Sequence, residues 1–470
     1  MNDKASIRQI LHLYSRAGFG ATLKELAALE NKSLAQVVQG IFADSEGQWE
    51  LDVIAEQDIP NKKDLNKLSE KEKKQLKELS KDYMQQLNVG WMKRMQAGEG
   101  ALREKMTFFW HGHFACRSEN PVMAQQLNNI QRKHALGSFR DLLIGVSQSP
   151  AMLSFLNNQQ NRKAHPNENF ARELMELFTL GRGNYTEQDV KESARAFTGW
   201  AFNRETYEFE FKAQHHDGGS KTFLGKTGNF NGEDVLDIIL GKKECARFIC
   251  DKLYRFFVNE TTDKEKVEEL AEHFYASNYD IGLLMKKILD PGWFCDEKNI
   301  GVRIKSPVEL IAGMNRMFSV AYEDEGRIIW LQKALGQVLF FPPNVAGWSG
   351  GRNWIDSSTL MLRLKIPSVV LNSGIIEAEA KEDIPEEYKL MVMKQQEQVK
   401  KEIGKRIKTT VDWDAWLATL PADTDLGKLI GYLLLPGLSP VRQQQLSAFS
   451  GENIKAITLQ LVSMPEYQIC

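Results

Sequence analysis

The chain has 470 residues, of which 60 are basic and 62 are acidic, so its formal net charge is -2. A charge this close to zero gives no global field that would attract nucleic acid or an anionic membrane, and we expect no nucleic-acid partner. Hydrophobic residues make up 42% of the chain. No run of about 18 of them occurs, so no transmembrane segment is expected.

The five cysteines are odd in number and include no Cys-x-x-Cys pair, which favours free thiols in a reducing compartment. The first residues lack the apolar stretch of a secretion signal. The printed chain therefore predicts a cytoplasmic location, or a periplasmic or exported one if a signal has been removed.

Helical signals dominate the first part of the chain. Thr22 is a good N-cap for a helix over 23–29. Segment 61–98 is rich in Lys and Glu, and its leucines recur at helical spacing, which predicts an amphipathic helix with one densely charged face. We interpret it as a charged helical arm, which is either a solvated face or a lid or partner-binding element.

The middle of the chain continues in the same way. Helix is expected over 101–110, with Gly112 as its end, and over 121–147. Asn167 is a good N-cap for a helix over 168–180, and Gly181 is a good C′ residue at its end. Thr186 and Asp189 have capping-box spacing before a further helix over 187–198.

Residues 201–230 break this pattern with alternating aromatic and polar residues and four glycines, which predicts an irregular or β-hairpin insert. Helices are expected again at 232–240, 243–258, 263–276, 280–290, 306–318 and 357–365, in a second charged helical arm over 377–408, and in short pieces over 426–466. The sequence thus predicts a mainly α, multi-helix globular array, a single module over 1–470 with a small insert near 201–230.

The densest polar segment spans residues 165–181. One face of a helix here would carry four polar residues at spacings of three and four, namely Asn169, Arg172, Glu173 and Glu176. Two carboxylates one turn apart can act as acid and base or ligate a metal, so we predict these four as catalytic residues. Salt bridges between helices are the alternative. Asn167, at the helix start, is a candidate ligand-binding residue because free N–H groups there attract an anion.

Two histidines flank a glycine in the aromatic run Trp110-His111-Gly112-His113-Phe114. In an extended segment both rings would point to the same side, as two ligands of one metal do. In a helix they would lie about 200° apart and would not chelate together. Because glycine favours a break, the extended case stays open, and His111 and His113 are candidate metal ligands.

His216 and Asp217 lie in a Gly-rich run at residues 214–219. They are either exposed, inert loop residues or further metal ligands. With His111, His113 and the two glutamates they would supply the mixture of imidazole and carboxylate that Zn, Fe or Mn prefers. A divalent-metal cofactor is expected only if these distant segments meet.

A long loop at 341–356 is rich in Pro, Gly and Trp, which is typical of a functional or structurally special loop. Trp348 and Trp354, with polar neighbours such as Asn344, suit binding of a sugar ring or a peptide. The alternative is that both tryptophans fill the core beneath the loop. Lys305 completes the set of candidate ligand-binding residues as a partner for an anion.

Several sequence blocks together resemble the bacterial family of domain of unknown function 1800. The blocks are His12–Gly20, Phe109–Phe114, Pro166–Gly181, Asn184–Val190, Thr198–Trp200, Lys221–Gly225, Lys305–Glu309, Pro342–Trp348 and Pro465–Tyr467. The resemblance implies a helix-rich single module with no established activity, so it assigns no catalytic residue. It also implies a protein partner similar to the alkaline phosphatase/sulfatase superfamily, beside which many members are encoded, and export, for which this chain shows no signal.

These features support three hypotheses. The first is an enzyme, with or without a divalent metal, that hydrolyses an envelope polymer or a peptide. The second is a non-catalytic binding or assembly module that partners a second protein. The third is a binder of anionic ligands that uses Arg172, the helix start at residue 168 and Lys305. No P-loop, Gly-x-Ser-x-Gly or His-Glu-x-x-His motif occurs to favour a known reaction.

Overall fold

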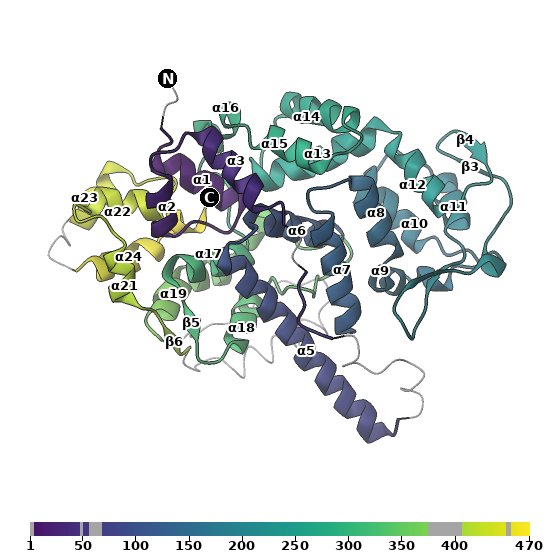
Figure 1. The fold of residues 1–470 in the computed structure, drawn as a ribbon, viewed down its shortest axis with the longest axis horizontal. Coiled ribbons are helices and arrows are strands. Elements are labelled where there is room, and N and C mark those ends of the chain that lie inside the picture. Colours follow the sequence, from purple (N-terminus) through teal and green to yellow (C-terminus); the bar gives the residue numbers. More distant parts are fainter. Residues whose placement is uncertain (1–3, 48–49, 56–67, 375–406, 448–452) are drawn as a thin grey trace.

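The computed structural model describes residues 4–47, 50–55, 68–374, 407–447 and 453–470 (Figure 1). Most of them are helical, and the strands form only two-stranded antiparallel sheets. The predicted mainly α fold class is therefore confirmed. Within these residues, no helix combines the length and the apolar character that a membrane span requires.

The first three helices begin where the sequence supplies a cap. They are α1 (Ile7–Ala17), α2 (Leu23–Leu29) and α3 (Leu34–Asp44). Ser6, Thr22 and Ser33 each form a capping box with the residue three positions on. These side chains satisfy backbone N–H groups that have no partner in a first helical turn, which fixes where each helix starts.

The C-terminal part of the chain packs beside these helices. Its elements are α21 (Trp413–Ala418), α22 (Leu426–Leu433), α23 (Pro440–Ser447), α24 (Ile454–Val462) and a 3-10 turn at Pro465–Gln468. α22 contacts both α1 and α24, and Figure 1 shows them together on the left of the molecule. Backbone hydrogen bonds of 3.0 and 2.8 Å join Arg303 to Cys470, so the last described residue is tied to the middle of the chain.

The centre of the molecule is built around α6 (Ala101–His113), which contacts α1, α3, α5 and α7. Its residues from Leu102 to His111 are all buried, and Trp110 has no exposed surface. The surrounding helices are α5 (Glu70–Ala97), α7 (Pro121–Lys133), α17 (Pro307–Phe318), α18 (Gly326–Leu335) and α19 (Ser357–Leu371). A helix buried on all sides forms the core of a large protein rather than one of its faces.

The remaining helices lie in the upper and right-hand parts of Figure 1. They are α8 (Phe139–Gln148), α9 (Pro150–Phe155), α10 (Asn169–Glu173), α11 (Glu187–Ala196), α12 (Gly232–Leu240), α13 (Lys243–Phe257), α14 (Lys264–Ala276), α15 (Ile281–Ile288) and α16 (Pro291–Phe294). Shorter 3-10 turns occur at Asn158–Gln160, Ala213–His215, Glu297–Asn299 and Gly351–Trp354, and a π-helical turn occurs at Leu174–Thr179. The helix expected over 121–147 is two helices, because Ser138 caps a new start after Lys133.

The insert near 201–230 contains two β-hairpins, as expected. In the first, β1 (Trp200–Phe202) pairs with β2 (Phe209–Phe211), and in the second, β3 (Lys221–Phe223) pairs with β4 (Lys226–Gly228). A further pair, β5 (Ala321–Tyr322) with β6 (Thr409–Thr410), joins distant parts of the chain. β3 packs against α11, which anchors the second hairpin to the helical body.

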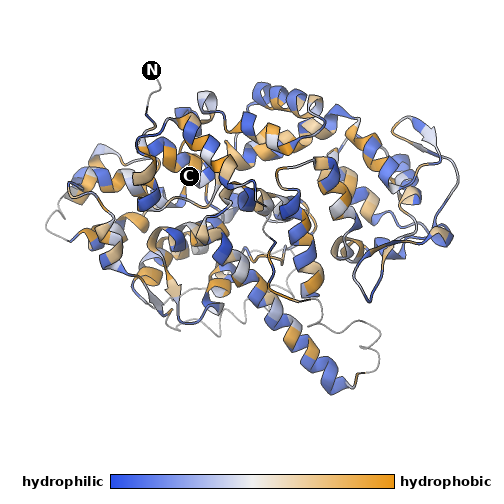
Figure 2. Ribbon diagram, viewed as in Figure 1, coloured by the Kyte–Doolittle hydropathy of each residue, from blue (hydrophilic) through white to orange (hydrophobic). Residues whose placement is uncertain are grey.

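Only the first part of the charged arm predicted at 61–98 projects from the molecule. α5 starts at Glu70, and its first turns are exposed and project from the body, where Figure 2 shows mostly hydrophilic residues. Its second half is buried against the core, including Leu87, Trp91 and Met95. Residues 61–67 of this predicted arm, and nearly all of the predicted arm at 377–408, lie outside the described residues.

Candidate functional site

The predicted pair of metal ligands on α6 lies inside a helix. α6 runs through Gly112 to His113, so the prediction that Gly112 ends the helix is wrong, and so is an extended His111–His113 segment. Glycine costs about 1 kcal/mol in a helix, and the burial of the surrounding aromatic residues outweighs that cost. A loop also packs against this turn, because a Cβ at Gly347 would lie 2.5 Å from the Gly112 carbonyl oxygen.

His111 faces that loop. Its Nε2 accepts a hydrogen bond from the Phe340 N–H at 3.0 Å, and its ring lies 5.6 Å from that of Trp348. Burial, assisted by the charge of Arg132, lowers the pKa of His111 to about 3. The imidazole is therefore neutral and holds the loop backbone in place.

His113 points to another side of α6. Its Nε2 lies 3.0 Å from the Phe178 carbonyl oxygen and its Nδ1 lies 3.3 Å from Lys252 Nζ. Burial, followed by the charge of Lys252, lowers the pKa of His113 well below its usual value. Lys252 also donates to the Leu177 carbonyl at 2.9 Å. The two side chains thus bind consecutive carbonyls of one helical turn.

That turn is the π-helix at Leu174–Thr179, which interrupts the α-helix expected over 168–180. Thr179 Oγ1 donates to the Leu174 carbonyl five residues earlier at 2.6 Å. A π-turn is a rare, wider turn that often occurs at functional sites. It starts directly after Glu173 and contains Glu176, so it shapes the segment that carries both predicted catalytic carboxylates.

The two carboxylates have different environments. Glu176 accepts hydrogen bonds from Arg182 Nε at 2.6 Å and from Tyr185 Oη at 3.0 Å. Glu173 is partly buried and has no hydrogen bond or ion pair with any described residue. Burial and the nearby charge of Glu176 raise the pKa of Glu173. One carboxyl is thus held by two donors, while its neighbour retains its proton to higher pH.

The other residues of this segment have structural partners. Arg172 forms ion pairs with Glu187 at 2.7 Å and Glu168 at 3.2 Å. Asn169 Nδ2 donates to the Leu156 carbonyl at 3.2 Å, and Asn167 Oδ1 accepts from the Asn169 N–H at 3.0 Å. The salt-bridge alternative therefore describes Arg172, and the two asparagines fix the start of α10.

The loop at 214–217 lies on α11. His216 Nδ1 is 2.9 Å from the Thr198 carbonyl oxygen, and Asp217 pairs with Arg195 at 2.7 Å. Asp217 also accepts from the Gly219 N–H at 2.9 Å. Throughout the described chain, no three His, Cys, Asp or Glu side chains are grouped so that they would hold a metal ion. The four candidate metal ligands, His111, His113, His216 and Asp217, are therefore not brought together.

The candidate ligand-binding residues are also separated. Trp348 is partly exposed and lies on His111, whereas Trp354 is 8% exposed and fills the core beneath the loop. Asn344 Oδ1 accepts from the Ala346 N–H within the loop at 2.9 Å. Lys305 lies elsewhere and donates to the Tyr467 carbonyl at 2.7 Å.

A groove of about 460 Å³ opens beside the carboxylate pair. Its lining residues are Leu180, Gly183, Asn184, Tyr185, Thr186, Asp189, Leu224, Gly225, Lys242 and Glu244. Most of them are polar, and the volume lies within the usual range of about 300–1,000 Å³ for small-molecule sites. Tyr185 connects the two features, because it lines the groove and donates to Glu176.

Comparison with known proteins tests the resemblance found in the sequence. The family described as protein of unknown function (DUF1800) matches residues 12–469. The chain belongs to the DUF1800 family. No curated protein and no solved structure matches it. The function of this DUF1800 chain therefore has to be argued from its own residues.

The structure of the DUF1800 chain also brings together basic residues that the sequence analysis did not single out. Arg16, Lys105, Arg303 and Arg363 are buried near Lys305, where three of the sequence blocks meet. A signal was present, because Arg16 and Lys105 interrupt apolar helical segments. A sequence alone does not show that such a charge is buried, since the same pattern occurs on solvated faces.

Proposed function

We propose that this DUF1800 chain is a hydrolase in which Glu173 and Glu176 act as an acid–base pair on a polar polymer or peptide bound in the groove beside Tyr185. The observation that carries the proposal is the contrast between the two carboxyl groups. Burial and the charge of Glu176 raise the pKa of Glu173, while Arg182 and Tyr185 donate to Glu176. Neighbouring carboxyl groups in such different environments are typical of acid–base pairs.

The roles follow from these environments. Protonated Glu173 gives its proton to the leaving atom of the substrate as the scissile bond breaks. Glu176, as a carboxylate, accepts a proton from the attacking water, whose oxygen joins the other fragment. One water is consumed, and exchange of a proton between the two carboxyls through solvent restores the starting state.

Two features support placing substrate in the groove. Tyr185 lines the groove and donates to the Glu176 carboxylate, which lies outside the lining, and the groove walls carry side chains of both charge signs, Asp189, Lys242 and Glu244. Gly183 and Gly225 have positive φ angles of 87° and 83°, and a Cβ at either position would meet nothing within 4 Å. Their backbone is thus open to a ligand lying along the groove.

The proposal is tested by incubating the full chain with peptidoglycan, dye-linked polysaccharides and casein, followed by detection of soluble fragments. Cleavage of one of these substrates is expected to fall at least about 100-fold in Glu173→Gln and in Glu176→Gln, the usual range for losing a general acid or base. Glu268→Gln is the matched control, because Glu268 also pairs with an arginine, Arg247, at 2.6 Å. The proposal is wrong if both active-site variants cleave as fast as the control.

A further inference from the structure

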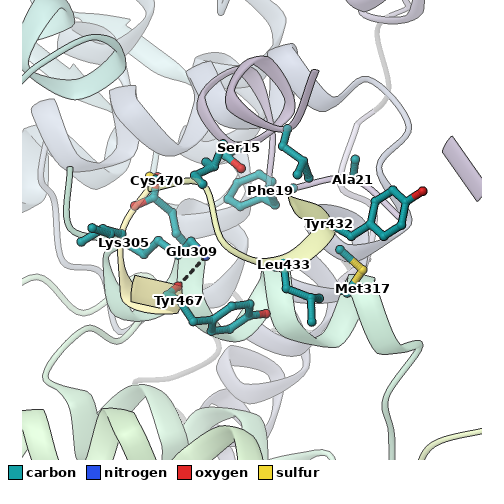
Figure 3. A pocket seen from close by; sticks show the side chains of 15 residues that line it. Ser15, Phe19, Ala21, Lys305, Glu309, Met317, Tyr432, Leu433, Tyr467 and Cys470 are labelled. Atoms are coloured by element: carbon teal, nitrogen blue, oxygen red, sulfur yellow. Dashed lines mark hydrogen bonds between the residues drawn. The ribbon is translucent and has the colours of Figure 1, made fainter. Parts of the chain in front are cut away.

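A second site lies far along the chain from the carboxylate pair. A cavity of about 50 Å³ forms where α1, α17, α22 and the C-terminal segment meet (Figure 3). Its polar wall consists of Ser15, Lys305, Glu309 and Cys470, and its apolar wall includes Phe19, Met317 and Leu433. This volume exceeds the roughly 10–15 Å³ that one water requires, so the cavity has room for a compact group of several atoms.

Two donors on this wall have hydrogen-bonding capacity to spare. Lys305 Nζ donates to the Tyr467 carbonyl at 2.7 Å, the bond dashed in Figure 3, and an ammonium group has two further N–H donors. The Ser15 hydroxyl has no hydrogen-bond partner among the described residues. A ligand in the cavity would therefore meet donors from both α1 and the segment before α17.

Basic side chains surround the same place. Lys105 Nζ donates to Glu309 Oε1 at 2.5 Å and to the Gly18 carbonyl at 2.8 Å, and Arg303 also donates to Glu309. Arg16 Nη2 donates to the backbone oxygen of Cys470 at 2.6 Å. Arg363 donates to the Lys305 carbonyl at 2.5 Å. With Lys305, five basic side chains are thus clustered around Glu309 and several backbone oxygens.

The negatively charged groups within reach are fewer than the basic ones. Among the described residues, Cys470, Glu309 and Glu260 act on these five basic groups, and Cys470 acts on all of them except Arg363. Buried positive charge in excess of the negative charge around it is costly. An anion in the cavity would reduce this cost.

The thiol of Cys470 reports the same local potential. Burial raises its pKa, but Arg303 and Arg16 lower it more, so that the net shift is downward. The other four cysteines show the opposite result, because burial raises the pKa of the thiols of Cys116, Cys245, Cys250 and Cys295. The surroundings of Cys470 therefore favour negative charge.

We infer that this cavity binds a compact tetrahedral oxyanion, of the size of inorganic phosphate or sulfate, between Lys305 Nζ and the Ser15 hydroxyl. The volume of about 50 Å³ fits a small free ion better than a bulky ester. The five basic groups give the cavity a positive electrostatic potential, and the Glu309 carboxylate is hydrogen-bonded to Lys105 and Arg303. The site is separate from the groove, so the inference does not depend on the proposed hydrolase activity and is tested independently of it.

The test is isothermal titration calorimetry of the full chain with sulfate, inorganic phosphate and phenyl phosphate at one ionic strength set with chloride. Sulfate and phosphate are expected to bind at one site, and phenyl phosphate at least about tenfold more weakly. The inference is overturned if neither sulfate nor phosphate binds at ligand concentrations up to about 10 mM, a range that would detect dissociation constants as weak as roughly 10 mM. Equal binding of phenyl phosphate overturns the assignment to a free ion.

Two variants locate the site. Lys305→Gln is expected to weaken sulfate binding at least about tenfold, because it removes a charge-assisted hydrogen bond. Ser15→Ala removes one neutral hydrogen bond to the ion and no hydrogen bond within the described chain, and it is expected to weaken binding about two- to tenfold. Lys252→Gln is the matched control, since Lys252 also donates to a carbonyl and burial also lowers its pKa to about 8. Sulfate affinity that is unchanged in Ser15→Ala, or equally reduced in the control, contradicts the placement.

Discussion

Three buried histidines predict that the protein loses stability in mild acid. His12, His111 and His113 are 0%, 4% and 6% exposed. Burial and, secondarily, Arg16 lower the pKa of His12 to about 3, and burial with Arg132 does the same for His111. The pKa of His113 lies well below 6.5 for the reasons given above. All three are therefore neutral in the folded protein, whereas they titrate near 6.5 once the chain unfolds.

The sign and size of the effect follow from proton binding. Below pH 6.5 the unfolded chain binds protons that the folded chain does not, so the free energy of unfolding decreases as pH falls, down to about pH 3. Each of His12 and His111 then costs about 1.4 kcal/mol per pH unit, which gives about 2 kcal/mol at pH 5 and about 4 kcal/mol for the two. The lowered pKa of His113 adds to this loss in the same direction. Total stabilities of about 5–15 kcal/mol are typical, so this is a large fraction.

The assay is urea unfolding at pH 7.5 and 5.0, followed by the fluorescence of the ten tryptophans. The wild-type chain is expected to lose at least about 4 kcal/mol between these pH values, and His111→Gln about 2 kcal/mol less than the wild-type chain, since one titrating group is gone. His165→Gln, at an exposed histidine, is expected to behave as wild type. A loss below about 1 kcal/mol in the wild-type chain would refute the reasoning.

Three other perturbations have definite expected outcomes. In the core, Arg132 pairs with Glu104 at 2.7 Å, so Glu104→Gln leaves a buried charge unpaired and is expected to lower the free energy of unfolding by about 3–5 kcal/mol. Glu268→Gln, at an exposed pair, should lower it by less than about 1 kcal/mol. Equal losses in the two variants would contradict this prediction. Gly347→Ala places a Cβ on a backbone with a φ of 79° and within 2.5 Å of the Gly112 carbonyl oxygen. It is expected to lower the free energy of unfolding by about 2 kcal/mol or more, measured by thermal unfolding. Gly350→Ala, with open space around the added Cβ, should change it little. Sulfate affinity is expected to fall about tenfold from pH 7 to pH 9, because Lys305 loses its charge over this range. Burial lowers the pKa of Lys305 to about 8; the charges of Arg363 and Lys105 also lower it, whereas those of Cys470 and Glu309 raise it. A sulfate affinity that does not change with pH would show that Lys305 is not the partner.

Local signals predicted the fold well wherever they act within a few residues. The capping box of Thr186 and Asp189 placed the start of α11, and Asn231 and Ser306 act in the same way for α12 and α17. The glycines and alternating aromatics of 201–230 correctly indicated hairpins. Caps and turns depend on local backbone groups, so a sequence alone is sufficient for them.

Features that depend on tertiary contacts were missed. Gly112 stays helical because buried aromatic residues and the backbone of Gly347 pack around it. The π-turn after Glu173 is held by His113 and Lys252, which bind two of its carbonyl groups. The basic cluster needs helices α1, α6 and α17 to meet. Neither periodicity nor propensity encodes such long-range contacts, since tertiary context overrides local preference.

The proposed acid–base pair depends on Glu173 holding its proton to higher pH than an ordinary glutamate. Carboxyl carbon NMR of the selectively labelled full chain measures this directly, with the Glu173 signal assigned as the one that disappears in Glu173→Gln. The expected midpoint lies above 4.5 and moves down in Glu176→Gln, because the nearby charge is removed. A Glu173 midpoint at or below 4.5 would contradict the proposed division of roles.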